Sequence, residues 1–102
     1  MNDSNLPGWL TKEELRSTFK KFGKAVKVSR LALIIGGENV ELGDNVRIDA
    51  FALILASNGW MTVGSNVHLA ARTTFLAAGG IMIEDHVGVS FNSSLISASD
   101  DL

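Results

Sequence analysis

The sequence predicts an all-β fold, a parallel β-helix of about four triangular coils that follows a short N-terminal α-helix. The first observation is an apolar residue at every sixth position, as in Leu42, Ile48 and Ile54. The second is that this pattern returns 20 or 21 residues later. The repeats align three columns of apolar residues: Leu42, Val63, Ile83; Ile48, Leu69, Val89; and Ile54, Phe75, Leu95. Six residues make one short strand and one turn, and stacked coils place equivalent residues about 4.8 Å apart.

The N-terminal part predicts a helix from about Lys12 to Phe22. Thr11 and Glu14 have the spacing of a capping box, in which each side chain bonds the other residue's amide. Leu15, Phe19 and Phe22 form one apolar stripe, and Gly23 fits a C-cap. We therefore assign residues 1–24 to a lead and helix, and residues 25–102 to the β-helix.

An incomplete coil is expected before the three repeats. Val28 and Ile34 each lie 20 residues before a residue of the next coil. The coils then share one corner that carries glycine: Gly36-Gly37, Asn58-Gly59 and Gly79-Gly80. We expect positive φ at each of these pairs. Asn45 and Asn66 should stack at another turn, where Asn tolerates the left-handed backbone conformation.

Composition excludes several functional classes. The net charge is −2, without the basic patch of a nucleic-acid-binding protein. Cysteine is absent, which rules out disulfides and thiolate metal sites. The longest apolar run, residues 31–35, is too short to span a bilayer, and the N-terminus lacks the pattern of a signal peptide. We expect a cytoplasmic protein with no membrane or nucleic-acid partner.

The segments LGDNVRI and VGSNVHL are close to ideal hexapeptides, and the chain from Thr11 to Leu102 resembles the hexapeptide-repeat acyltransferases. The EEL helix, ENVELGDNVRID, VHLAA and SSLISASDD are similar to sugar acetyltransferases of the galactoside, maltose and surface-polysaccharide types. The resemblance implies a left-handed β-helix and a cytoplasmic homotrimer, with acetyl-CoA in the groove between neighbouring prisms. It also implies that a sugar hydroxyl or amine attacks the thioester with a histidine as general base.

The resemblance points to candidate acceptor-binding residues near the end of the chain. Asn92 matches an asparagine that contacts the acceptor in galactoside and maltose acetyltransferases; the alternative is a turn asparagine. Ser97, Asp100 and Asp101 fall where relatives carry a polar run beside the acceptor pocket, and Asp100 stands where many have histidine. The alternative for that run is a solvated tail. Residues that bind the cofactor are not identified.

His86 is the candidate general base, because relatives place a catalytic histidine in this register of a coil. The alternative is an exposed turn residue in the slot of Asn45 and Asn66, 20 residues after Asn66. His68 flanks an inward Leu69, so we expect it to point outward in a structural or interface role. Two histidines fall short of the three zinc ligands of the γ-class carbonic anhydrases, and we expect no metal.

Relatives of this type continue with further coils, whereas this sequence stops at Leu102 on an unfinished one. We therefore expect a truncated chain, a natural fragment or a chain that a partner completes. Trimerisation would cover outward apolar residues such as Phe51, Leu55, Leu76 and Phe91. Two functions remain open: an acetyl-CoA-dependent transferase that acts on a sugar or nucleotide sugar, or part of one, and a non-catalytic β-helical assembly module. The acceptor, and the choice between O- and N-acetylation, also remain open.

Overall fold

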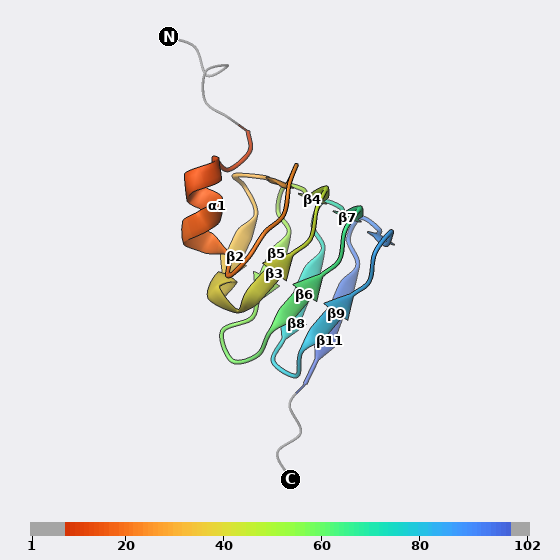
Figure 1. Ribbon diagram of the computed structural model, residues 1–102. Helices are drawn as coiled ribbons and strands as arrows, with labels where there is room; N and C mark the ends of the chain where they lie inside the picture. The colour runs from red at the N-terminus through yellow and green to blue at the C-terminus, as the bar shows by residue number, and fades with distance from the viewer. Residues whose placement is uncertain (1–7, 99–102) are drawn as a thin grey trace.

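The computed structural model describes residues 8–98. This range contains one α-helix, one 3-10 helix and eleven short strands (Figure 1). Their bounds are α1 Lys12–Thr18, β1 Lys27–Val28, β2 Leu33–Ile35, η2 Gly37–Asn39, β3 Val40–Leu42, β4 Val46–Ile48, β5 Leu53–Leu55, β6 Met61–Val63, β7 Val67–Leu69, β8 Thr74–Ala77, β9 Ile81–Ile83, β10 Gly88–Val89 and β11 Ser94–Ser97. None of the described helices is long and apolar enough to cross a membrane.

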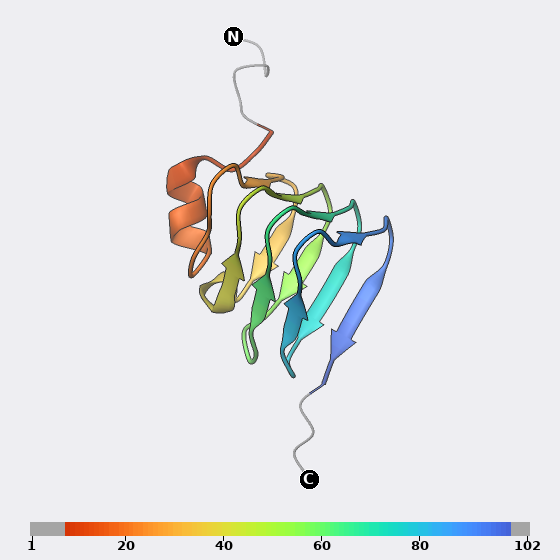
Figure 2. The same ribbon diagram turned by 45° about the vertical axis from the view of Figure 1, so that its right-hand side comes forward.

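The strands form three parallel sheets that make the faces of a solenoid. Their orders are β1-β4-β7-β10, β2-β5-β8-β11 and β3-β6-β9. Each strand pairs with its equivalent one coil later, so that Val46 lies beside Val67, and Ile54 beside Phe75. Figure 2 shows the coils stacked along one axis, from the yellow of the first repeat to the blue of the last. The predicted parallel β-solenoid and its register are therefore confirmed.

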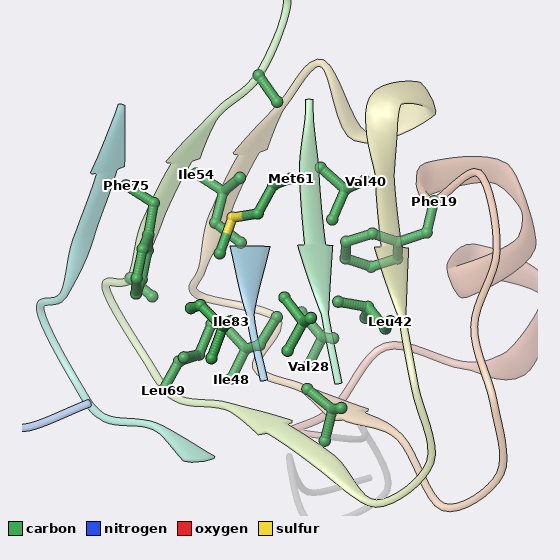
Figure 3. Packing of buried hydrophobic residues seen from close by; sticks show 14 of the residues in the cluster. Phe19, Val28, Val40, Leu42, Ile48, Ile54, Met61, Leu69, Phe75 and Ile83 are labelled. Carbon is green, nitrogen blue, oxygen red and sulfur yellow. The ribbon is translucent and has the colours of Figure 1, made fainter. Parts of the chain in front are cut away.

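The core is the interior of this prism. Leu42, Ile48, Ile54, Leu69 and Phe75 from the predicted columns are buried. Figure 3 shows these side chains gathered between the strands from which they come. Strand alternation explains the pattern, because every second side chain of a strand points to the same face.

Helix α1 packs its apolar side against the first coil through buried Leu15, and Phe19, which directly follows the helix, is buried in the same cluster. The capping box is present: Thr11 N donates to Glu14 Oε1 at 2.8 Å, and Glu14 N donates to Thr11 Oγ1 at 3.2 Å. The predicted extension of the helix to Phe22 was wrong. The backbone becomes extended at Phe19, and the Lys20 amide bonds solenoid carbonyls at 3.0 and 3.1 Å instead of a carbonyl of its own helix.

The corners explain how so short a repeat closes on itself. Asn45, Asn66 and His86 occupy one corner with φ of 54°, 58° and 63°, as the sequence predicted for the two asparagines. At the glycine corner, Gly36 and Gly80 have positive φ, but neither Asn58 nor Gly59 does. The expectation was therefore wrong for the middle pair. Gly59 is needed there for space, because a Cβ atom would collide with the Ala77 carbonyl.

Candidate functional site

A ladder of side-chain hydrogen bonds joins successive coils at the corner that contains Asn45, Asn66 and His86. Asp44 Oδ1 accepts from the Lys24 amide at 2.8 Å, and Ser65 Oγ accepts from the Asp44 amide at 2.9 Å. Asp85 Oδ1 continues the pattern by accepting from the Ser65 amide at 2.7 Å. Small polar side chains recur at this position because each must reach a backbone amide in the coil below. The Asp85 carboxylate is therefore held by the fold.

His86 stands in the same corner, directly after Asp85. Its side chain is exposed, and its backbone occupies the slot that Asn45 and Asn66 fill in the coils below. Those two asparagines bond each other, from Nδ2 to Oδ1 at 2.8 Å, whereas no hydrogen bond or ion pair joins the His86 ring to another described residue. The structure thus gives His86 the geometry of the turn alternative, and its catalytic role stays a prediction.

The other predicted site residues are spread over the last coil. Asn92 has φ of 69° at the second corner, where it follows Phe51 and Arg72 of the earlier coils. Ser97 ends β11 and is half-buried. Asp100 and Asp101 lie outside the described residues. His86 and Asn92 occupy different corners of one coil, so the structure does not bring these two candidates together.

A charged cluster that the sequence reasoning did not single out lies on the outer face of β4 and β7. Asp49 Oδ1 accepts from Arg47 Nε at 2.7 Å, and Asp49 Oδ2 bonds His68 Nε2 at 2.7 Å. Partial burial opposes ionisation of Asp49, but the hydrogen bonds from Arg47 and His68 outweigh it and hold the pKa of this carboxyl below its usual value. Both carboxylate oxygens are thereby fixed.

The repeat period contained a signal for this cluster. Arg47 and His68 are 21 residues apart and therefore stack on one outward column of the solenoid. Asp49 follows Arg47 by two residues, so both side chains leave the same face of the strand. Reading the outward columns as closely as the inward ones would have placed these three residues together.

Trp9 covers the N-terminal side of this cluster. It forms an antiparallel bridge with Ser29, and its ring lies 5.3 Å from the Arg47 guanidinium carbon and 5.9 Å from Lys27 Nζ. These are cation–π distances. The two cations are thus held beneath an aromatic ring, and the opposite side of His68, toward β10, stays open.

The other charged groups of the described range do not form a metal site. Within residues 8–98, no three His, Asp or Glu side chains come close enough together to hold a metal ion.

A hollow of about 410 Å³ lies on the outside of β6 and β9. Its walls combine apolar and acidic residues, namely Thr62, Gly64, Met82, Ile83, Glu84 and Asp85. Among the described residues, a carboxylate contacts an imidazole in one place, between Asp49 and His68.

Known proteins resemble the chain in both sequence and structure, although no protein-family model matches it. A dTDP-4-amino-4,6-dideoxy-D-glucose acyltransferase from Escherichia coli is 32% identical over 82 residues, which cover 80% of this chain and 43% of the relative. A mutant of AntD, an N-acyltransferase from Bacillus cereus, was solved in complex with dTDP-4-amino-4,6-dideoxyglucose and coenzyme A. It matches with a TM-score of 0.83 and 31% identity over 95% of this chain and 51% of its own.

AntD in complex with dTDP and 3-hydroxybutyryl-CoA matches with a TM-score of 0.72 and 33% identity, over 81% of this chain and 44% of its own. The chain thus spans about half the length of the relatives it matches. These matches confirm the resemblance that the hexapeptide motifs indicated. In sequence and in fold, the chain is a homologue of these acyltransferases, with the parallel β-solenoid expected of hexapeptide-repeat acyltransferases.

Proposed function

We propose that the protein transfers an acyl group from a coenzyme A thioester to the amine of a nucleotide-linked amino sugar. The observation that carries this proposal is the match to AntD, with a TM-score of 0.83 and 31% identity over 95% of the chain. The sequence motifs left hydroxyl and amine acceptors open, and the N-acyltransferase relative favours the amine. We also propose a cytoplasmic location, because coenzyme A thioesters and nucleotide sugars are cytoplasmic metabolites.

The proposed reaction needs no redox step. The amine nitrogen attacks the thioester carbonyl carbon, and the new C–N bond forms as the carbonyl oxygen becomes an oxyanion. The oxyanion collapses, the C–S bond breaks and its electron pair leaves with sulfur. One N–H proton must travel from nitrogen to sulfur, which gives an amide and the free thiol of coenzyme A. The protein must therefore supply a proton carrier and donors that stabilise the oxyanion.

We further propose that the working form is a homotrimer. Support comes from the outer face of the sheet β2-β5-β8-β11, where Leu33 is 57% exposed and Ile96 is 71% exposed. Ile35 and Leu55 lie in the same outward column as Ile96, and all three side chains are exposed. A contiguous apolar patch on a solvent-facing sheet marks a protein contact. Identical chains can each bury this face by packing around a threefold axis.

The function is tested with a thiol-release assay. The purified protein is mixed with acetyl-CoA or 3-hydroxybutyryl-CoA and with dTDP-4-amino-4,6-dideoxyglucose. Free thiol should appear only when the amino sugar is present. dTDP-glucose, which offers hydroxyls but no amine, is the matched control and should give no release. Calorimetry that detects no binding of coenzyme A would contradict the proposal and leave the assembly-module alternative standing.

The trimer is tested by the mass of the particle in solution. Ile96→Glu places a charge on the apolar face and should release monomers, because an unpaired charge would be buried in the contact. Met82→Glu is the control, since Met82 is 66% exposed but lies on the face formed by β3, β6 and β9. Light scattering coupled to gel filtration measures both variants. A wild type that is monomeric, or an Ile96→Glu trimer, would refute the assignment of this face.

A further inference from the structure

We propose that His68, held by Asp49, is the base that carries the proton from the acceptor amine during acyl transfer. This inference rests on the proposed function. Neither side chain belongs to the buried core, since both lie on the outside of the prism. It differs from the expectation that His68 is only structural and that His86 is the base.

The chemistry of the Asp49 contact decides which nitrogen of His68 can accept a proton. Asp49 is an ionised carboxylate held by Arg47, so it can only accept hydrogen bonds. The nitrogen that faces it, Nε2 at 2.7 Å, must therefore carry the hydrogen. In neutral imidazole the other nitrogen, Nδ1, then has the free lone pair. No described residue donates to Nδ1, so the contact leaves the basic atom of His68 available.

Space for a substrate exists on the open side of His68. The residue that pairs with His68 in the next coil is Gly88, and a Cβ atom built there has nothing within 4 Å. Arg47 fills the equivalent place in the coil below and lies under the Trp9 ring. Arg47 and Trp9 thus occupy the column on the N-terminal side of His68, whereas Gly88 places no side chain next to it. A small group can take the position of that Cβ atom, in the column of the imidazole, without meeting other described atoms.

The cluster also lies beside the apolar face proposed for trimer formation. Asp49 opens the turn in which the Ala52 amide bonds the Asp49 carbonyl, and this turn leads from β4 to β5 on the apolar sheet. Phe51, 59% exposed, stands at the corner itself. A second copy packed on the apolar face would bring its own surface to this corner. That surface would cover His68, whose side chain is 51% exposed in one chain, and shield it from water.

The proton moves in two steps. After attack, Nδ1 of His68 accepts one proton from the nitrogen of the tetrahedral intermediate, and the imidazolium is stabilised by the Asp49 carboxylate. As the C–S bond breaks, the same proton passes from Nδ1 to the departing sulfur. His68 returns to its neutral form, and nothing is consumed besides the amine and the thioester. Asp49 itself stays ionised and acts as the positioning residue.

The test compares equivalent variants of the two histidines in the purified protein with acyl-CoA and dTDP-4-amino-4,6-dideoxyglucose. We expect His68→Gln to lower kcat by about 100-fold or more, the usual contribution of a positioned base, and a smaller loss in His86→Gln is the result that separates His68 from the alternative base. Asp49→Asn should lower kcat by about tenfold or more, with less effect on KM, because the carboxylate holds the histidine in the correct tautomer.

Two further measurements separate the outcomes. Nitrogen NMR of the wild type should show hydrogen on Nε2 of His68 and not on Nδ1, and circular dichroism should show that every variant is folded. His68→Asn serves as a second variant if the glutamine side chain disturbs the fold. An active wild type with equally active His68 variants would overturn the role of His68 alone. A wild type that never transfers an acyl group would overturn the proposed function and this inference with it.

Discussion

Gly64 offers the sharpest test of how tightly the coils are stacked. A Cβ atom at this position would lie 2.7 Å from the Asp85 nitrogen and 2.9 Å from the Glu84 carbonyl carbon, where ordinary contacts begin near 3.4 Å. Two bonds of 2.7 Å cross the same gap, from Gly64 N to the Ile83 carbonyl and from Ser65 N to Asp85 Oδ1. The coils therefore cannot separate without weakening both. We expect the overpacking in Gly64→Ala to cost about 1–3 kcal/mol of unfolding free energy.

Gly88→Ala is the matched control for this substitution. A Cβ atom at Gly88 meets nothing within 4 Å, and neither glycine has positive φ. Both variants therefore gain the same ~0.4–1 kcal/mol from a less flexible unfolded chain, and this gain cancels in their difference. Urea denaturation followed by circular dichroism, at one protein concentration, should find Gly64→Ala less stable by about 1–3 kcal/mol. Equal unfolding free energies would refute the idea that rigid coil spacing selects glycine at position 64.

Three other predictions concern the core, the cap and the corners. Phe75 is fully buried at the centre of the prism, so Phe75→Ala should cost about 3–5 kcal/mol in the same denaturation assay, and a loss below about 1 kcal/mol would contradict this. The hydrogen bond from Arg30 lowers the pKa of Glu14 to about 2 in the folded chain, below its ordinary value of 4.5. The resulting stability is present above pH 4.5 and is lost as the pH falls toward 2. The thermal midpoint of Glu14→Gln should therefore depend less on pH over this range than that of the wild type. The same pH dependence in both proteins would count against the ion pair. At Asn66, with φ of 58°, Asn66→Ala should be about 1 kcal/mol less stable than Asn66→Gly, because both lose the bond from Asn45 but only alanine is strained; equal stabilities would contradict this.

The candidate site was harder to read from the sequence than the fold. Motifs that resemble hexapeptide acyltransferases directed attention to His86 and Asn92, which the structure places at two different corners. The Asp49–His68 contact was missed because its residues lie on the outer surface. Outward side chains are not selected by a core, so the apolar pattern carries no information about their contacts.

The sequence by itself determined the solenoid and its register. A six-residue period within a repeat of 20 or 21 residues leaves one alignment that buries every apolar column, because a slip by one residue would turn each inward side chain to solvent. It also determined the start of α1, since the capping box is a local contact between Thr11 and Glu14. Both features depend on neighbours that spacing along the chain already specifies.

Only the tertiary structure decided where α1 ends and which carboxylate holds His68. The helix stops at Thr18 because the carbonyls of Gly37 and Val40 compete for the Lys20 amide. The residues around Thr18 carry no pattern that predicts a hydrogen bond to positions so distant in the chain. His68 turns toward Asp49 through a choice of side-chain rotamer across two coils. Both outcomes depend on groups that become neighbours only after the coils have stacked.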